Sequence, residues 1–137
     1  MIEDCIFCRI VKGEIPSSKV YEDENILAFL DIAPVHKGHT LVIPKKHFET
    51  ILDIPEEELK ELILAVKKVA IAVEKGVGAD GFVITMSNKK AAEQEVPHAH
   101  FHIIPRSEDD GLKHWPKIEY KEGELEEYKN KIINSLE

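Results

Sequence analysis

One short segment restricts the fold of this chain more than any other, "VPHAHFHIIPR", residues 96–106. Histidines occupy every second position, His98, His100 and His102, and small or apolar residues alternate with them. Alternate residues of a β-strand point to the same face of a sheet. The segment therefore predicts a strand, ended by Pro105, with three imidazoles on one face and an apolar opposite face.

A face of this kind has three possible uses. Histidines two residues apart can bind a metal from one strand. An imidazole nitrogen is also a good nucleophile toward phosphorus or acyl carbon near neutral pH, and flanking histidines can serve it as hydrogen-bonding partners. The third use is ordinary polar surface. Three histidines in register favour a reactive or metal-binding face over plain surface.

The bulk composition limits the class of protein. The length of 137 residues fits one domain, and 43% hydrophobic residues predict a folded core. A net charge of −8, from 26 acidic and 18 basic residues, argues against a nucleic-acid polymer as partner but not against a single nucleotide. No apolar run is long enough to cross a bilayer, and the N-terminus lacks a signal-peptide pattern, so we expect a cytoplasmic protein without a membrane partner.

The order of elements predicts an α+β fold. A short helix begins after Cys5, and the segments "KVYED", "ILAFLD" and "HTLVIP" follow as strands. A long helix comes next, and "GFVITM" and "HAHFHIIP" complete a sheet of about five strands. The short connections between consecutive strands favour antiparallel pairing.

The long helix and the tail carry clear apolar stripes. The long helix has apolar residues at helical spacing between Leu59 and Val73, a capping-box pattern of Asp53 and Glu56, and a stop at Gly76 or Gly78. We assign residues 1–110 to one domain. Residues 111–137 form a more polar tail with a short helix, which belongs to the same domain or to a dimer interface.

Three blocks of the sequence, in one order, give the chain a family resemblance. The segment "QEVPHAHFHIIPR" resembles the motif of the histidine triad (HIT) family, in which three histidines alternate with apolar residues. "FLDIAPVHKGHTLVIPKKHF" and "CIFCRIVKGEIPSSKVYEDE" resemble the other characteristic stretches of that family. The resemblance extends from about Cys5 to Arg106 and is closest to the phosphoramidase-like branch. It implies the HIT fold and a homodimer.

The resemblance also implies a reaction. Family members are nucleotide hydrolases or nucleotidyl transferases that act at the α-phosphate of nucleoside phosphoramidates, dinucleoside polyphosphates or nucleotidyl adducts. By position, His100 attacks phosphorus, and water then hydrolyses the nucleotidyl-histidine intermediate. His102 donates a hydrogen bond to the phosphoryl oxygens or the leaving group, and His39 lies near the α-phosphate. The implied substrate is an AMP-containing nucleotide with a purine base.

Further positions match the family's nucleotide-binding residues. Asp31 matches the acidic residue that holds the ribose hydroxyls, and Gln94 matches a loop glutamine that helps to neutralise phosphoryl charge. The positions around the base are apolar: Ile6, Phe7, Ile10, Phe29, Ile32 and Val96. For Phe29 and Ile10, a place in the ordinary core is an equal alternative.

Two positions depart from the family pattern. Ser87 stands where the family usually has asparagine, with Asn88 next to it, and either side chain could bind a phosphate. Glu93 stands where the family favours glycine, just before Gln94, and its carboxylate would repel a phosphate unless it points away. These departures concern the leaving group and the rate more than the reaction class.

The two cysteines, Cys5 and Cys8, form a C-x-x-C pair. No thioredoxin-like unit surrounds them, which disfavours a redox pair. A closed structural zinc site needs four ligands. His47 and His98 complete the set, as in zinc-bearing members of the superfamily, and leave His100 free to attack. The expected cofactor is therefore a structural Zn²⁺, and the alternative is two unrelated buried thiols.

Four functions remain open at this point. The first is a homodimeric phosphoramidase with His100 as nucleophile, and the second is a dinucleoside polyphosphate hydrolase of the same family. The third is a zinc hydrolase in which the three histidines bind the metal and a metal-bound water attacks. The fourth is a nucleotide-binding module without turnover.

Overall fold

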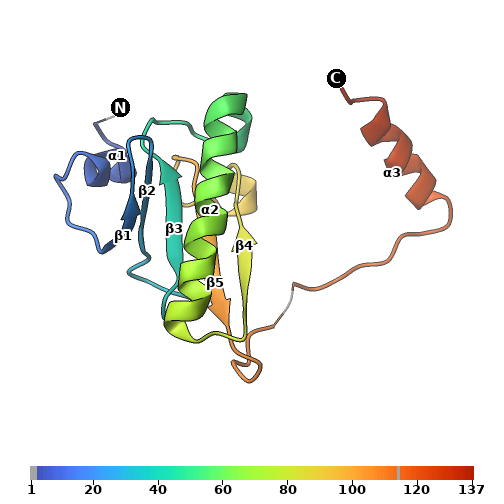
Figure 1. Ribbon diagram of the computed structural model, residues 1–137. Coiled ribbons are helices and arrows are strands. Elements are labelled where there is room, and N and C mark those ends of the chain that lie inside the picture. The colour runs from blue at the N-terminus through green and yellow to red at the C-terminus, as the bar shows by residue number, and fades with distance from the viewer. Residues whose placement is uncertain (1–2, 114) are drawn as a thin grey trace.

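The structure is a computed structural model, which describes residues 3–113 and 115–137. Within these described residues, five strands and three α-helices follow one another with two short 3₁₀ turns (Figure 1). The order is α1 (Ile6–Val11), β1 (Lys19–Glu22), β2 (Ile26–Leu30), β3 (Thr40–Pro44), η1 (Ile51–Asp53), α2 (Glu56–Val77), β4 (Gly81–Thr85), η2 (Lys90–Ala92), β5 (Phe101–Arg106) and α3 (Glu124–Ile133).

The strands form one antiparallel sheet in the order β1-β2-β3-β5-β4. This confirms the predicted α+β class with about five strands, one long helix and a short N-terminal helix. The last strand, β5, inserts between β3 and β4, because α2 carries the chain across the sheet before β4 begins. The histidine-rich segment therefore lies inside the sheet, and β4 is left at an edge.

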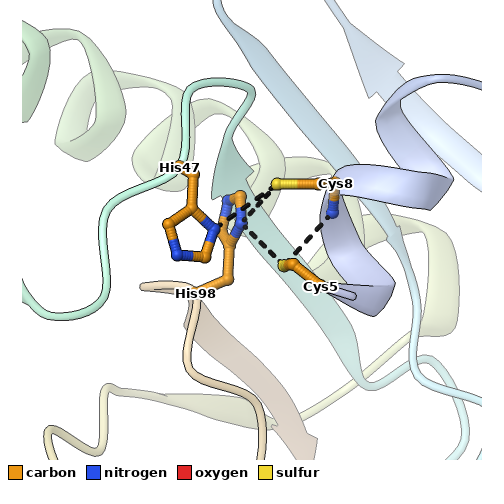
Figure 2. A group of neighbouring side chains, drawn as sticks. All are labelled: Cys5, Cys8, His47 and His98. Atoms are coloured by element: carbon orange, nitrogen blue, oxygen red, sulfur yellow. Dashed lines mark hydrogen bonds between the residues drawn. The ribbon is translucent and has the colours of Figure 1, made fainter. Parts of the chain in front are cut away.

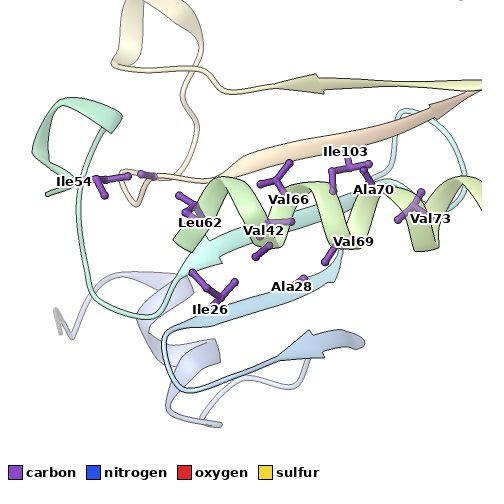
Figure 3. Packing of buried hydrophobic residues seen from close by; sticks show 12 residues of the cluster. Ile26, Ala28, Val42, Ile54, Leu62, Val66, Val69, Ala70, Val73 and Ile103 are labelled. Carbon is purple, nitrogen blue, oxygen red and sulfur yellow. The ribbon is translucent and has the colours of Figure 1, made fainter. Parts of the chain in front are cut away.

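Helix α2 covers one face of the sheet (Figure 3). Its buried stripe packs against alternate residues of β2, β3 and β5, as the apolar periodicity predicts. Leu62 is fully buried in this layer, so we expect truncation to alanine to cost about 2–5 kcal/mol. The buried members are Ile26, Ala28, Val42, Ile54, Leu62, Ala65, Val66, Val69, Ala70, Val73, Ala99 and Ile103.

Helix α1 packs against the opposite face. Its residues Phe7 and Ile10 are buried against Phe29, Leu41 and neighbouring side chains of β2 and β3. The imidazoles of the triad point to this face, since His102 lies opposite Leu41 in the β3–β5 pairing. The short helix thus closes a second, smaller apolar layer beside the histidines.

The start of α2 differs from the prediction. Asp53 does not cap α2 with Glu56. Instead, the Asp53 carboxylate accepts from the Thr50 backbone N–H at 3.1 Å in a capping box around η1. Pro55 is the N-cap of α2 and makes no side-chain cap bond. The end agrees with one of the two candidates, because Gly78 adopts the left-handed conformation that terminates the helix.

The histidine strand is also shifted from its predicted bounds. Strand β5 begins only at Phe101 and continues through Pro105 to Arg106. Beyond Ile103 the strand has only β4 as its neighbour, so Pro105 lies where one side of the strand is free. Proline is tolerated there because no neighbour requires its missing N–H. His98 and His100 precede the regular strand but face the same side as His102.

The tail forms the predicted short helix, α3, but its apolar side is open. Leu125, Tyr128 and Ile132 are all exposed, and Figure 1 shows α3 at the end of an extended segment, well away from the sheet. Among the described residues, no helix has the length and apolarity that a membrane crossing requires.

Candidate active site and metal cluster

The position of His100 fixes which of its nitrogens is free. The ring is buried, and its Nδ1 lies 2.7 Å from the carbonyl oxygen of His98. A carbonyl oxygen can only accept, so Nδ1 carries the proton and Nε2 carries the lone pair. Phe7 packs edge-on against the ring, with centroids 5.1 Å apart, and holds its orientation. His100 is therefore a fixed imidazole with an unprotonated Nε2.

A second chain of bonds fixes the tautomer of His102. The Val35 backbone N–H donates to His39 Nδ1 at 3.1 Å, so the neutral His39 carries its proton on Nε2. His39 Nε2 lies 2.8 Å from His102 Nδ1, which therefore accepts. His102 must then carry its own proton on Nε2. His102 therefore presents a fixed N–H donor next to the lone pair of His100.

Asp31 lies at the edge of this histidine pair. One carboxylate oxygen accepts from the Ala33 backbone N–H at 2.9 Å, and the other is 3.7 Å from His39 Nε2. The carboxylate is partly exposed, while His39 is buried. Oxygen lone pairs of Asp31 therefore remain available to a ligand beside the histidines.

Burial keeps the histidines neutral. It lowers the pKa of His100 and of His39 below their ordinary value, and the Asp31 carboxylate only partly opposes this effect. For His102, burial and then the neighbouring His100 and His39 lower the pKa to about 4. At neutral pH the nucleophile candidate therefore has a free lone pair, and the ring beside it carries no charge.

The sequence-predicted metal ligands form a compact cluster (Figure 2). Cys5 Sγ lies 3.4 Å from His98 Nδ1, and Cys8 Sγ lies 3.7 Å from the same atom and 3.4 Å from His47 Nδ1. His98 Nε2 donates to the Pro44 carbonyl at 2.8 Å, so its Nδ1 carries the lone pair and faces both sulfurs. Burial also raises the pKa of the Cys5 thiol.

These residues fit a zinc ion. Around a tetrahedral Zn²⁺, a sulfur at about 2.3 Å and a nitrogen at about 2.0–2.1 Å are separated by roughly 3.6 Å. The sulfur–nitrogen distances of the cluster, 3.4–3.7 Å, lie close to that separation. The bond from His98 to the Pro44 carbonyl is also the orienting bond that metal-bound histidines usually make. Sequence analysis gave no indication of this carbonyl.

The three triad histidines do not form one metal site. His98 belongs to the cysteine cluster, and His102 forms a separate group with Asp31 and His39. Among the described residues, His100 belongs to neither group. The arrangement therefore disfavours a hydrolase in which all three histidines bind a single metal.

The predicted base-binding residues lie in two environments. Phe7, Ile10 and Phe29 are buried in the layer under α1, and Val96 packs against that layer. Ile6 is half exposed, and Ile32 is 99% exposed beside Asp31. A base above this face would contact the exposed pair and rest on the buried layer.

The residues of the predicted phosphate loop mainly hold the loop itself. Asn88 accepts from the Ile51 backbone N–H at 2.8 Å, and Gln94 bridges the Lys89 N–H and the Glu49 carbonyl. Ser87 is partly exposed. Glu93 has a φ of +66°, a conformation that favours glycine and that explains why a glycine would suit this position.

A cavity of about 670 Å³ opens on the face of the sheet that carries the triad histidines. Thr85 and Ile104 line it, and Thr85 pairs with His102 across β4 and β5, so both side chains point the same way. Trp115 and Lys117 of the tail form its outer wall. Trp115 is 86% exposed at this wall.

Comparison with known protein families and sequences gives a consistent result. The model of the HIT domain family matches residues 12–109. An uncharacterized HIT-like protein of Methanocaldococcus jannaschii is 57% identical over 107 residues, which are 78% of this chain and 82% of that protein. An adenosine 5'-monophosphoramidase of Schizosaccharomyces pombe is 42% identical over 134 residues, which are 96% of this chain and 98% of the relative.

Solved structures agree over nearly the whole chain. A crystal structure of a protein from Streptococcus mutans matches with a TM-score of 0.92 and 42% identity, and the match covers 100% of this chain and 88% of the other. A Zn-bound histidine triad family protein from Mycobacterium smegmatis matches with a TM-score of 0.77 and 39% identity, over 98% of both chains.

Proposed function

This chain belongs to the histidine triad family, and on that premise we propose that it is a hydrolase of nucleoside phosphoramidates, with adenosine as the nucleoside. The observation that carries the proposal is the pair of fixed tautomers, with an unprotonated His100 Nε2 beside a protonated His102 Nε2. Relatives that bear the name adenosine 5'-monophosphoramidase support the substrate class.

In the first step, His100 Nε2 attacks the α-phosphorus and the bond from phosphorus to the leaving nitrogen breaks. The leaving nitrogen departs with that electron pair and takes up a proton from the solvent, so that it leaves as an amine. The attacking ring becomes cationic, and the His98 carbonyl, 2.7 Å from Nδ1, stabilises this charge. His102 Nε2–H donates to the phosphoryl oxygens or to the leaving nitrogen.

In the second step, water attacks the phosphorus of the nucleotidyl-histidine intermediate. The bond to Nε2 breaks, its electron pair returns to His100, and AMP leaves with release of a proton. Throughout, Asp31 holds the ribose hydroxyls through its available oxygens, and Ile32 and Ile6 lie against the base. Ser87 and the backbone of the loop before the triad complete the phosphate contacts.

We assign the Cys5, Cys8, His47 and His98 cluster to a structural zinc ion. The zinc-bound relative from Mycobacterium smegmatis and the sulfur–nitrogen distances support this assignment. When bound, the ion would join the N-terminal segment to the start of the catalytic strand. The ion would hold His98 in place, and the His98 carbonyl in turn accepts from Nδ1 of His100 and fixes that ring.

We also propose a homodimer that forms along β4. This strand lies at the sheet edge, and its residues Phe82, Val83 and Ile84 are 38–41% exposed. An edge strand with three such residues is a ready surface for a second copy. Light scattering of the purified protein gives the mass that tests this contact.

Intact-mass spectrometry during turnover of adenosine phosphoramidate tests the catalytic proposal. The wild-type protein should carry one added AMP group when quenched, and His100→Ala should carry none. His36→Ala, in the loop before β3, serves as the matched control and should retain the adduct. If the wild type turns over without an adduct and His100→Ala keeps that activity, His100 is not the nucleophile and direct attack by water is favoured. If a dinucleoside polyphosphate is hydrolysed faster than the phosphoramidate, His100 remains the proposed nucleophile but the proposed substrate class is wrong.

A further inference from the structure

The second step of the proposed reaction needs a group that takes a proton from water. Water forms its bond to phosphorus while the bond from phosphorus to His100 Nε2 breaks, and the electron pair of that bond returns to the ring. The attacking water becomes more acidic as its oxygen bonds to phosphorus, so a positioned base accelerates this step. A general base for this water is therefore expected in the site.

The three imidazoles at the reacting phosphorus have no lone pair left for this proton. His39 Nδ1 accepts from the Val35 backbone N–H at 3.1 Å. His102 Nδ1 accepts from His39 Nε2 at 2.8 Å, and the other nitrogen of His102 carries a proton. In the intermediate, His100 Nε2 is bonded to phosphorus, and its Nδ1 donates to the His98 carbonyl. The base must therefore be a residue other than these histidines.

Two carboxylates lie close enough to act on His100. Burial lowers the pKa of His100, and the carboxylates of Asp31 and Glu95 are among the groups that oppose this effect. Asp31 lies beside His39 and holds the ribose hydroxyls in the proposed reaction. Glu95 is exposed, and among the residues that the structure describes it belongs to none of the ion pairs. Glu95 is thus the carboxylate without another task.

The loop before β5 holds the backbone of Glu95 at the face that carries the triad. The side-chain amide of Gln94, the residue before it, is bonded to two backbone groups at 2.7 and 2.6 Å. Val96, the residue after it, packs against the apolar layer that contains Phe7, and Phe7 packs edge-on against the ring of the nucleophile. The His98 backbone N–H donates to the Val96 carbonyl at 2.8 Å, which makes a tight turn into the triad. Both neighbours of Glu95 are therefore fixed.

The position that this role requires agrees with an electrostatic effect on His100 and no direct contact. Water attacks phosphorus from the side opposite to Nε2, so phosphorus and water both lie between the base and His100. A reacting water lies about 3–3.5 Å from phosphorus, and the base lies about 2.6–3.2 Å from that water. Glu95 acts on the pKa of His100, whereas the hydrogen bond of the His100 ring goes to the His98 carbonyl.

We propose that Glu95 is the general base that takes a proton from the hydrolytic water in the second step. The oxygen of water bonds to phosphorus, its proton passes to a carboxylate oxygen of Glu95, and the bond from phosphorus to His100 Nε2 breaks. AMP leaves, and Glu95 then releases the proton to solvent. This role rests on the proposed function, because it needs the nucleotidyl-histidine intermediate, and it gives Glu95 no part in the first step.

Intact-mass spectrometry that follows the loss of the adduct tests this role. Each full-length protein is mixed with less than one molecule of adenosine phosphoramidate per site and quenched at successive times. The adduct should form at a similar rate in the wild type and in Glu95→Gln. It should disappear roughly 100-fold more slowly in Glu95→Gln, the low end of what a positioned base contributes. Glu93→Gln removes a carboxylate two residues away and is the matched control, which should lose the adduct as the wild type does.

The other outcomes separate this role from the proposed nucleophile. Equal rates of adduct loss in the wild type and in Glu95→Gln would overturn the role of Glu95 and leave His100 as the nucleophile. Slow adduct loss in Asp31→Asn but not in Glu95→Gln would also overturn it and assign the base to Asp31. An adduct in none of the proteins would overturn His100 as the nucleophile, and the role of Glu95 with it.

Discussion

His98 and His102 lie four residues apart on one face, yet their rings present different groups, a lone pair on His98 and an N–H on His102. Burial is the main cause that lowers the pKa of each to about 4. The difference lies in the partner of each ring. The Pro44 carbonyl directs the free nitrogen of His98 toward two sulfurs, whereas His39 accepts from Val35 and directs the N–H of His102 outward. A backbone group behind each ring therefore decides whether it presents a lone pair or a proton.

The largest effect should come from the histidine between them. His100→Ala removes the proposed nucleophile, and we expect kcat to fall by at least about a thousandfold. Because the metal cluster remains intact, the variant should keep its zinc and unfold near the wild-type temperature. Steady-state kinetics, metal analysis and thermal unfolding provide the three readouts. Loss of zinc in His100→Ala would mean that the metal cluster depends on the His100 side chain.

The metal end should mainly affect stability. Cys8→Ser removes a fully buried ligand, and we expect loss of zinc and of about 3–5 kcal/mol, on the order of 10 °C in Tm. The kcat of the protein that remains folded should fall much less than in His100→Ala. Ser87→Ala, a change that leaves the cluster untouched, is the control for zinc content. A Cys8→Ser protein with normal zinc content would contradict the assigned ligands.

The periodic segments could be predicted from sequence, but the contacts that orient the site residues could not. Alternating histidines and the apolar stripe of α2 repeat at fixed intervals, so their faces could be predicted. Asn88 and Gln94 were assigned to phosphate from resemblance, but their bonds to Ile51 and Glu49 depend on segments more than 35 residues away in the chain. The roles of Val35 and Pro44 depend on backbone groups, and a backbone N–H or carbonyl leaves no trace in residue type. The stripe of α3 predicted a helix but could not reveal that its own chain leaves it uncovered.

The chain of bonds behind His102 should have an intermediate effect. His39→Phe removes the donor that fixes the His102 tautomer, and we expect kcat to fall about 10- to 100-fold with a smaller change in KM. His39→Gln, whose amide can both accept and donate, should recover part of that loss. Nitrogen-15 shifts of His102 should show a proton on Nε2 in the wild type and a mixture of tautomers in His39→Phe. A pure Nε2–H tautomer in both proteins would show that His39 does not set it.

The smallest effect concerns acid stability. The ordinary pKa of histidine is 6.5, and that of folded His102 is about 4, so between these values the unfolded chain binds a proton that the folded protein does not. Stability from His102 is therefore complete above pH 6.5 and is lost as the pH falls toward 4, with a total of roughly 2–3 kcal/mol after allowance for partial exposure. Urea unfolding at pH 7.5 and pH 5 measures this loss, and the same measurement on His102→Gln subtracts the contributions of all other groups. His102→Gln should lose less stability than the wild type over that interval. An equal loss in both proteins would mean that folded His102 accepts a proton at the ordinary pKa of histidine.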